Sequence, residues 1–404
     1  MKKKKIIIIG GGAAGIFCAA NLDENKFHVT ILEQNSDVLQ KVKISGGGRC
    51  NVSHACFDPK ELIQFYPRGN KELLSVFHKF QPGDTMEWFE NRGVALKIEK
   101  DNRIFPESNS SQSIIDAMLN EVKSKNFEIK TKSVVLEIEK LEHQYLVKTN
   151  SSEYIADQLI YTTGSSPKSL KILQNLGHQI VALVPSLFTF NIKNDVLKDL
   201  MGTSFLNAQV SIPKLKMEES GPMLITHWGL SGPAVLKISA WKARELAALN
   251  YQFPILVNFL GLDVEDASEI FHQFRQQNPK KTIGASKIFD VTTRFWHRIL
   301  WLSKIDLNKN ISSLSGKEIE NMLKNLCGNE MKVTGKSTYK DEFVTAGGIE
   351  LKEINFKNMS SKILENFYIA GEVLNIDAVT GGFNFQACWS EGFLIAEDLN
   401  CKLV

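Results

Sequence analysis

The fold of this chain is decided by the stretch Lys5-Ile6-Ile7-Ile8-Ile9-Gly10-Gly11-Gly12-Ala13-Ala14-Gly15. Four consecutive isoleucines predict a fully buried strand of a parallel sheet. The glycines that follow have the spacing G-x-G-x-x-G, which is typical of a turn that brings a pyrophosphate to a helix N-terminus. In that arrangement Gly10 permits the tight turn, Gly12 the approach of the phosphates, and Gly15 the close packing of helix and strand. Ala13 and Ala14 would open the helix.

A second strand is predicted at His28-Val29-Thr30-Ile31-Leu32, and Glu33 and Gln34 follow it directly. Glu33 comes 18 residues after Gly15, close to the spacing of about 20 residues expected for an acid that binds ribose hydroxyls. An ordinary glycine-rich turn is the alternative, but strand, turn, helix and acid agree on a dinucleotide site. A 2′-phosphate would be repelled by Glu33, so we do not expect bound NADP at this position.

The composition is that of a globular protein of 404 residues with a net charge of +3. The length suggests two or three domains, and the charge is too small to indicate nucleic acid or a membrane by itself. We expect no transmembrane helix, because no stretch of about 18 apolar residues occurs. The lysines at positions 2–5 imitate a signal peptide, but the apolar run that follows is far too short.

Six cysteines are present, and none of them forms a C-x-x-C pair; they are Cys18, Cys50, Cys56, Cys327, Cys388 and Cys401. This usage argues against a redox-active dithiol and suggests a reducing compartment, the cytoplasm. A metal site of Cys50, His54 and Cys56 can be imagined, but no second ligand pair follows at a suitable spacing. We therefore expect no metal.

After Glu33 we expect a loop with Lys41 and Lys43, which leads into a second glycine motif, Ser45-Gly46-Gly47-Gly48-Arg49-Cys50-Asn51. Consecutive glycines suit a backbone that presses against a flat ligand or adopts positive φ. Arg49 and Asn51 would add a cation and an amide at the same place. A flexible surface loop is the alternative.

The chain from Asp84 to Gly164 predicts two helices, a hairpin, and a small antiparallel meander that leads into a buried strand. The helices are expected at 84–91 and 113–124, the hairpin at 94–98 and 103–105, and the meander at 127–132, 134–139, 144–149 and 154–156. The buried strand, residues 158–162, ends at Thr163-Gly164, where the turn approaches the dinucleotide again. Val135 of the meander is among the expected cofactor contacts.

The C-terminal part repeats the pattern of strand, glycine turn and helix. A buried strand is expected at Phe367-Tyr368-Ile369-Ala370-Gly371-Glu372, and the segment 377–389 opens a last helix that runs to about residue 399. Cofactor contacts are expected from Asn384, Phe385, Gln386 and Ala387, with backbone N–H groups near 384–386 stabilising negative charge at flavin N1 and C2=O. A helix that only packs is the alternative.

Glycine units at both ends of the chain predict one long dinucleotide, FAD, because an NAD-only enzyme would not need the second unit. There is no second G-x-G-x-x-G, so any NAD(P)H would dock transiently. Between the two units lies an insertion that is first β-rich and then helical. We expect the cofactor domain at 1–186 and 346–404, the β-rich domain at 187–260 and 329–345, and the helical insertion at 261–328.

These motifs resemble the BaiN/RdsA-like family of NAD(P)/FAD-dependent oxidoreductases, the conserved flavoproteins. The resemblance covers essentially the whole chain. Besides the two N-terminal glycine motifs, it is carried by Thr226-His227-Trp228-Gly229-Leu230-Ser231-Gly232-Pro233, Val344-Thr345-Ala346-Gly347-Gly348, Ala370-Gly371-Glu372 and Gly381-Gly382-Phe383-Asn384. The family implies a glutathione-reductase-type, Rossmann-like FAD domain of the α/β class, with an inserted β-barrel domain and a helical domain nested in the barrel.

The resemblance also implies an enzyme in which NAD(P)H reduces the flavin and hydride passes from N5 to a conjugated C=C bond. Some members look like reductases of steroid-like enones, and others like enzymes that reduce a ribosomal RNA uridine to dihydrouridine. A flavin-bearing binding protein without turnover is the alternative from another class. The sequence does not give the acceptor, the choice of NADH or NADPH, or the oligomeric state.

Both reductions need a proton donor, and the candidates are Cys50 and His227. The alternatives are a small buried core residue for Cys50 and a hydrogen-bonded structural residue for His227. For an RNA substrate, phosphates would be gripped by basic residues of the helical insertion: Arg275, Lys280, Lys281, Lys287, Arg294 and Arg298. A solvated basic surface is the alternative there.

Overall fold

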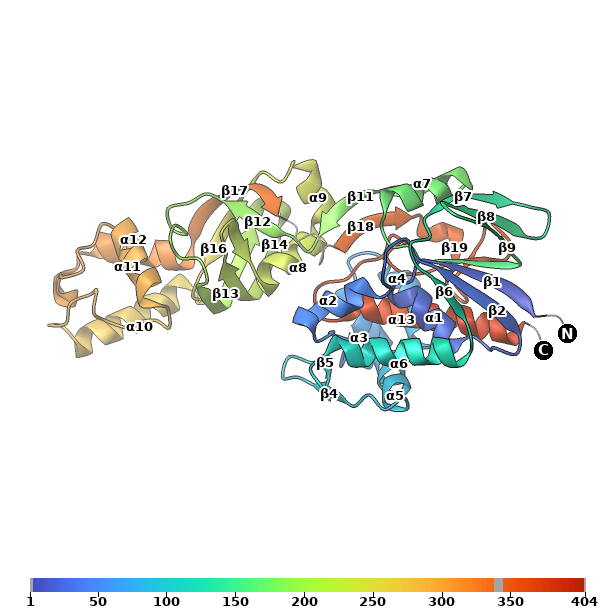
Figure 1. The fold of residues 1–404 in the computed structure, drawn as a ribbon. Coiled ribbons are helices and arrows are strands. Elements are labelled where there is room, and N and C mark those ends of the chain that lie inside the picture. The colour runs from blue at the N-terminus through green and yellow to red at the C-terminus, as the bar shows by residue number, and fades with distance from the viewer. Residues whose placement is uncertain (1–2, 338–343, 403–404) are drawn as a thin grey trace. The chain divides into compact units, whose positions relative to one another are not determined.

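The computed structural model describes residues 3–337 and 344–402. The chain forms two compact units, of which the first comprises residues 1–184 and 340–404 and the second residues 185–339 (Figure 1). The order of the chain therefore places one unit as an insertion in the other. None of the helices in the described residues combines the length and the apolar character that crossing a bilayer requires.

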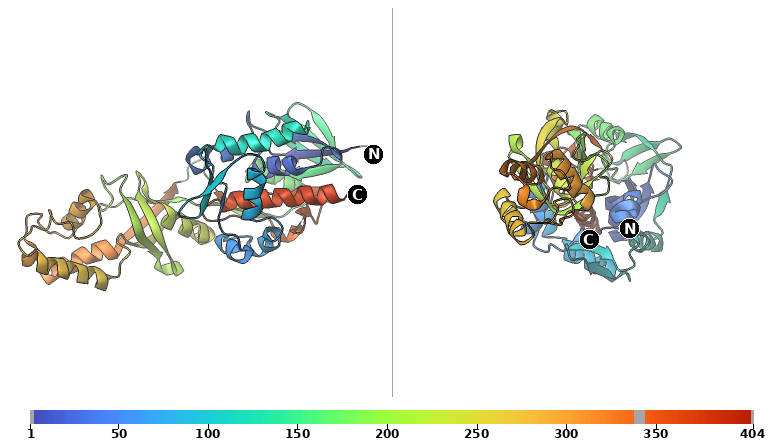
Figure 2. Two further views of the ribbon diagram at one scale, coloured as in Figure 1. Left: turned by 90° about the horizontal axis from the view of Figure 1, so that it is seen from below. Right: turned by 90° about the vertical axis from the view of Figure 1, so that its left-hand side faces the viewer.

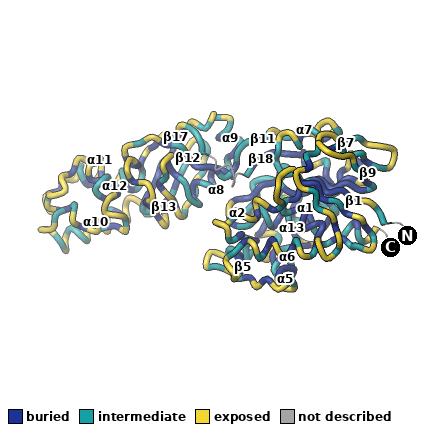
Figure 3. Tube along the Cα trace, viewed as in Figure 1, coloured by how far each residue is buried: buried dark blue, intermediate teal, exposed yellow. Residues whose placement is uncertain are grey.

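The first unit is built on a seven-stranded sheet in the order β19-β20-β21-β10-β1-β2-β6. β1 (Lys4–Ile9) lies between β10 (Gln158–Tyr161) and β2 (Phe27–Leu32), and pairs with both in parallel. All four isoleucines of β1 are buried, as predicted, and Figure 3 shows this part of the sheet as buried. Since parallel strands lie on both sides of β1, the carboxyl ends of the strands form the edge where an α/β sheet binds its ligand.

Three helices cover one face of this sheet, and a meander covers the other (Figure 1). The helices are α1 (Ala13–Asn21), α6 (Ser111–Ser124) and α13 (Phe383–Cys401). The meander consists of β7 (Val135–Lys140), β8 (Tyr145–Thr149) and β9 (Glu153–Ala156). The long α13, red in Figure 2, packs so closely on α1 that a Cβ at Gly392 would lie 2.7 Å from the carbonyl oxygen of Ala14.

Shorter elements complete the first unit. They are α2 (Gln40–Gly48), α3 (Pro59–Leu62), α4 (Asn70–Phe77), α5 (Pro82–Glu90) and α7 (Pro167–Asn175); the small sheet β3 (Ser53–His54), β5 (Arg103–Pro106) and β4 (Leu96–Ile98); the pair β11 (Ile180–Ser186) and β18 (Val344–Ile349); and the remaining strands of the main sheet, β6 (Glu128–Lys130), β19 (Ile354–Asn355), β20 (Ser360–Ser361) and β21 (Phe367–Ile369).

Two expectations about the first unit are wrong. β6 pairs in parallel with β2 and not with the meander. β6 follows α6 and completes a strand–helix–strand crossover. The sequence of a short alternating strand does not indicate whether it pairs with β2 or with the meander. Residues 40–44, expected in a loop, are helical, and the helical φ/ψ values break off only at Ser45, Gly46 and Gly47.

The second unit contains a closed six-stranded barrel in the order β12-β15-β14-β13-β16-β17. Its strands are β12 (Thr189–Ile192), β13 (Ser204–Ile212), β14 (Met217–Ile225), β15 (Gly229–Ser231), β16 (Phe253–Asn258) and β17 (Asn329–Ser337). The helices α8 (Pro233–Trp241) and α9 (Ala243–Ala248) connect β15 to β16. The sequence did not predict β14, in which most positions are exposed or only half-buried. β17 lies in the segment 329–345, which we expected to belong to the β-rich domain.

Three helices follow β16: α10 (Val264–Gln277), α11 (Thr293–Leu302) and α12 (Gly316–Cys327). Their apolar faces and the barrel interior form one hydrophobic core. Three rings, those of Phe205 in the barrel, Phe259, and Phe295 of α11, contact one another at tilted or edge-on angles, with centroids 4.7 to 5.0 Å apart. Barrel and helices therefore stabilise each other, and their separation into two domains stays a prediction.

Candidate functional site

The turn after β1 has the geometry of an anion site. A Cβ at Gly10 would lie 2.4 Å from the carbonyl oxygen of Thr162, and one at Gly15 only 2.2 Å from the carbonyl oxygen of Gly10. At Gly12 no atom lies within 4 Å of the added carbon, so this point of the backbone borders open space. Gly12 caps α1 without a side chain, which leaves the first N–H groups of the helix available to an anion.

Glu33 lies at the end of β2, beside this turn, and is buried. Its Oε2 accepts a hydrogen bond from the Gly11 N–H at 2.9 Å, and its Oε1 accepts from the backbone N–H of Asn35 at 2.8 Å. Gln34 between them is exposed. The backbone N–H of Ser133 donates to the Glu33 carbonyl oxygen at 2.8 Å. Val135, which is half-buried and begins β7, follows Ser133 by two residues and therefore lies near Glu33.

The second glycine motif turns through three consecutive left-handed residues, with φ of 57° at Gly46, 69° at Gly47 and 83° at Gly48. A Cβ at Gly46 would lie 2.9 Å from the backbone nitrogen of Asn51, whereas those at Gly47 and Gly48 would meet nothing within 4 Å. The backbone of Asn51 therefore packs tightly against Gly46, whereas Gly47 and Gly48 face open space. This is the form that a backbone pressed against a flat ligand requires.

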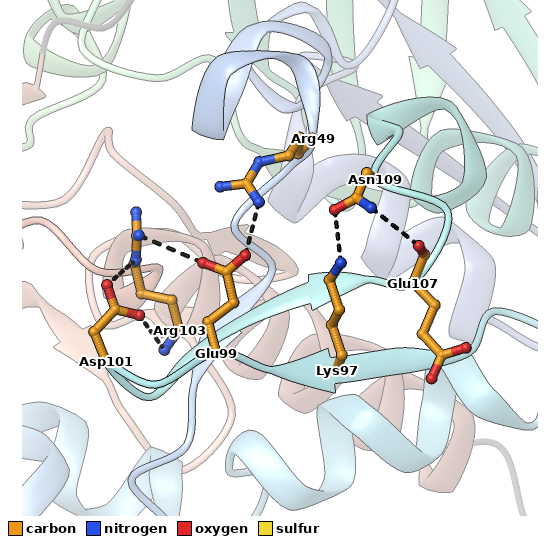
Figure 4. A network of polar contacts seen from close by, with 7 residues as sticks. All are labelled: Arg49, Lys97, Glu99, Asp101, Arg103, Glu107 and Asn109. Atoms are coloured by element: carbon orange, nitrogen blue, oxygen red, sulfur yellow. Dashed lines mark hydrogen bonds and ion pairs between the residues drawn. The ribbon is translucent and has the colours of Figure 1, made fainter.

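Arg49 does not offer the free cation that the sequence suggested. Its guanidinium forms an ion pair with Glu99 at 2.7 Å (Figure 4). It also lies over the ring of Phe105, 3.9 Å from the centroid. The physical reason is the β4–β5 hairpin, which brings a carboxylate and an aromatic face to the motif. Lys43 is exposed on α2, and its carbonyl oxygen accepts a hydrogen bond from the Ser111 hydroxyl at 2.8 Å.

The two glycine motifs from opposite ends of the chain are in direct contact. Gly382 caps α13 with φ of 94°, and a Cβ there would lie 2.5 Å from the carbonyl oxygen of Ser53. With its amide oriented to satisfy both sides, Asn51 donates to that carbonyl at 2.9 Å and accepts from the Gly382 N–H at 3.0 Å. Asn51 therefore joins the motifs.

The residues expected from the start of α13 have different environments. Asn384 exchanges hydrogen bonds with the backbone of Ala378, at 3.0 and 3.2 Å. Phe385 stacks on Trp389, and Ala387 is buried. The backbone N–H of Gln386 donates to the Gly382 carbonyl at 3.1 Å, so the stabilising N–H groups expected at 384–386 shift to residues 383–385.

The Gln386 side chain lies in the core, where it accepts from the hydroxyls of Ser53 at 2.6 Å and Thr85 at 3.0 Å.

The turn before α13 is held by contacts that the sequence did not reveal. Asp377, fully buried, forms a two-pronged ion pair with Arg68. The Tyr66 hydroxyl donates to the carbonyl oxygen of Phe383 at 2.6 Å. These contacts fix the direction in which α13 begins.

A further set of loops meets at the carboxyl ends of β10 and β21. Thr163 and Gly164 follow β10, and Gly371 and Glu372 follow β21. Glu372 forms an ion pair with Lys41 of α2 and accepts a hydrogen bond from the Thr345 N–H at 3.1 Å. A Cβ at Gly164 would lie 3.9 Å from the Glu372 carboxylate. The predicted residues after these two strands therefore lie together.

The Gly371 N–H donates to Glu391 of α13 at 2.6 Å, and the other carboxylate oxygen of Glu391 has no hydrogen-bond partner in the described residues. Burial raises the pKa of Glu391 from 4.5 to about 8. The folded protein thus holds a proton that the unfolded chain releases above about pH 4.5. The contribution of Glu391 to stability is present below that pH and is lost as the pH rises toward 8.

We expect Glu391→Gln to remove this dependence, because the amide cannot ionise and its oxygen still accepts from Gly371. Between about pH 5 and pH 8, wild type should lose unfolding free energy relative to the variant. The measurement is the urea midpoint of both proteins across this range. Parallel pH profiles for the two proteins would show that Glu391 does not titrate there.

The two candidate proton donors differ in position. Cys50 is completely buried, and burial raises the pKa of its thiol to about 12. The alternative of a small core residue therefore describes Cys50, and its expected role as a proton donor is not supported. No group of three His, Cys, Asp or Glu side chains able to hold a metal exists in residues 3–337 and 344–402, and this includes the Cys50, His54 and Cys56 segment.

His227 is exposed and lies in the second unit, in the turn between β14 and β15. It lines an open basin of about 1030 Å³, together with the segment after β12 and one arginine of α11. The basin residues are Ile192, Lys193, Asn194, Asp195, Leu197, Lys198, Asp199, Met201, Thr226, His227, Gly229 and Arg294.

Comparisons with known proteins agree with this architecture. The family model of the HI0933-like protein Rossmann domain matches residues 4–398. The chain is 26% identical over 401 residues to a ribosomal RNA dihydrouridine synthase of Escherichia coli, covering 96% of both chains. It is 25% identical to a 3-dehydro-bile acid delta(4,6)-reductase of Clostridium scindens, covering 95% of both.

Among solved structures, a 3-ketosteroid dehydrogenase from Rhodococcus jostii, crystallised with 4-androstene-3,17-dione, superimposes with a TM-score of 0.50 at 10% identity. The alignment covers 98% of this chain and 97% of that one. At this identity the likeness concerns the fold alone. Together with the parallel sheet and the closed barrel, it confirms the predicted fold class of a Rossmann-like cofactor domain with a barrel.

Proposed function

The chain belongs to the HI0933-like Rossmann-domain family, and we propose that it reduces uridine to dihydrouridine in ribosomal RNA. Family membership confirms the resemblance drawn from the sequence, and the protein is an FAD-dependent oxidoreductase. The substrate rests on one observation: the similarity to the ribosomal RNA dihydrouridine synthase extends over 96% of both chains. It therefore includes the barrel and the helices as well as the nucleotide turn.

The residues of the first unit fit FAD. The free first-turn N–H groups of α1 and the open backbone at Gly12 suit the pyrophosphate, and Glu33 suits the ribose of the adenosine half. The open faces of Gly47 and Gly48 and the N-terminus of α13 suit the flavin end. The remaining proposed contacts lie in the same loops, namely Asn51, Thr163, Gly164, Gly371, Glu372, Asn384 and Phe385.

When bound, FAD supplies a hydride carrier between NAD(P)H and an activated C=C bond. The chain has to bind and orient the substrate and to provide a proton for the carbon next to the one that receives hydride. We assign that proton to His227, which is exposed on the family-specific turn. An imidazole N–H can act as a general acid toward such a carbon. A ribosomal RNA substrate would place the protein in the cytoplasm.

The deciding experiment is mass spectrometry of ribosomal RNA from a strain without this gene. We expect dihydrouridine to be lost at one or more positions and to return with the wild-type gene. Dihydrouridine that is unchanged in the deletion strain would end the RNA proposal for this protein.

The His227→Gln protein tests the proton donor. With wild-type FAD content, it should form dihydrouridine about a hundredfold more slowly on protein-free ribosomal RNA. The comparison is made from initial rates with equal amounts of flavin-loaded enzyme. A rate equal to that of wild type would remove His227 from the mechanism.

A reductase of small enones is the second candidate, because the bile-acid reductase is similar over 95% of both chains. Oxidation of NADH or NADPH by the purified yellow protein, with and without a steroid enone, distinguishes the two. Consumption that depends on the enone, with normal dihydrouridine in the deletion strain, would favour the small substrate. No consumption with any acceptor would favour a flavin-bearing binding protein without turnover.

A further inference from the structure

We infer that the basin of the second unit is an RNA-binding surface, with Lys193 and Lys198 contacting phosphates and Trp228 stacking on an unpaired base. The inference rests on the proposed function, because ribosomal RNA is the polyanion considered. It moves the expected RNA contact away from the helical insertion, to the segment after β12 and the turn before β15.

Lys193 and Lys198 are exposed, and neither makes an ion pair or a hydrogen bond with another described residue. The arginines behind them serve a different purpose. Arg294 donates to the carbonyl oxygen of Asp199 at 2.8 Å, and Arg298 donates to the carbonyl oxygen of Asp195. The α11 arginines thus hold the 193–199 segment in place, while the two lysines stay available for phosphates.

Charge in the basin favours an anion that touches the lysines. Its lining holds three cations and two carboxylates, and one of these carboxylates, Asp199, faces Arg298 at 3.9 Å. An elongated polyanion can follow the lysines and avoid the exposed Asp195. A compact acidic ligand filling the basin would meet both signs of charge, so the pattern favours a chain of separated phosphates.

Trp228 lies between His227 and Gly229, which both line the basin, and 58% of its surface is exposed. Its turn is rigid. The Thr226 N–H donates to the Gly229 carbonyl at 2.8 Å, and a Cβ at Gly229 would lie 2.2 Å from the carbonyl oxygen of Phe190. The Trp228 carbonyl also accepts from the Ile192 N–H at 2.8 Å, next to Lys193 in the chain. An exposed aromatic ring on such a fixed turn can stack on a base of single-stranded nucleic acid.

The basic residues of the helical insertion are mostly occupied. Arg275 donates to the carbonyl oxygen of Ser312 at 2.7 Å, Lys281 lies over the ring of Phe274, and Lys287 faces Asp290 at 3.9 Å. These three cations of the insertion therefore already contact partners within it.

The test uses the full-length flavin-loaded protein and labelled fragments of protein-free ribosomal RNA from the deletion strain. Lys193→Glu/Lys198→Glu should weaken RNA retention on filters by at least about tenfold and flatten the salt dependence by about 1.4 in log–log slope. Trp228→Ala should weaken binding by about tenfold with an unchanged slope, and Trp228→Phe should retain most of it. FAD content and RNA-independent NAD(P)H oxidation should stay at wild-type levels.

The matched control is Lys280→Glu/Lys317→Glu, which reverses the charge of two exposed lysines of the helical segment. Neither of these lysines lines the basin. It should change RNA binding by less than about twofold. An equal loss of RNA binding in both double variants would overturn the assignment. Wild-type RNA binding by the basin variant would also overturn it, and so would a wild-type protein that retains no RNA. Basin-dependent binding with unchanged dihydrouridine in the deletion strain would support the surface and refute the reaction.

Discussion

Gly12→Glu should abolish FAD binding while leaving the protein folded. The added side chain meets no protein atom within 4 Å of its Cβ, and the backbone at Gly12 is extended, with φ of −85°. The new carboxylate would occupy the place of the pyrophosphate at the N-terminus of α1 and repel it. We expect bound FAD to fall below about a tenth of the wild-type amount, and activity to fall with it. Flavin absorbance per protein and the unfolding midpoint are the measurements.

Gly316→Glu is the matched control. Gly316 also begins a helix, α12, and a Cβ there also meets nothing within 4 Å, but it lies in the second unit. It should keep wild-type FAD content and activity. A flavin content for Gly12→Glu equal to that of this control would show that the cofactor does not use the N-terminus of α1.

Asp377→Ala should destabilise the first unit more than any surface substitution. Asp377 is completely buried, and its partner Arg68 would keep a largely buried charge without this carboxylate. Breaking a buried ion pair costs about 3 to 5 kcal/mol. FAD affinity should fall as well, because Asp377 anchors the turn that starts α13. The unfolding midpoint in urea and a flavin titration measure the two effects.

Glu397→Ala provides the comparison. Glu397 faces Lys79 at 3.9 Å, and both side chains are well exposed. Removing such a pair costs about 1 kcal/mol or less. If Asp377→Ala shifted the midpoint no more than Glu397→Ala does, the Arg68–Asp377 pair would not be what holds the turn.

Local patterns in the sequence were sufficient for the parts whose chemistry is local. The isoleucine run, the three spaced glycines and Glu33 predicted β1, its turn, α1 and β2, and the structure confirms these elements. The glycine motif at 46–48 predicted positive φ, which all three residues have. Each prediction rests on backbone sterics or burial within a few neighbouring residues, and sequence spacing records such information directly.

For single side chains, the structure adds contacts with distant segments that the sequence did not predict. Arg49 stays a predicted ligand contact, and its guanidinium pairs with Glu99 and lies over Phe105. Cys50 was a candidate acid, but the core encloses it. The sequence near a residue does not predict such contacts, because the contacting residues lie tens of positions away along the chain.

The sequence by itself determined that this protein has a βαβ nucleotide turn at its start and a second glycine-capped helix at its end. The sequence also predicted that both ends hold one FAD, but only the tertiary structure decided which contacts join them, namely Asn51 with Gly382 and Arg68 with Asp377. Tertiary packing also closed the barrel. At its basin, Arg294 and Arg298 donate to backbone carbonyl oxygens, whereas Lys193 and Lys198 are exposed. The physical reason is that periodicity and spacing encode local conformation, whereas a buried contact across some 300 residues depends on the packing of the whole unit.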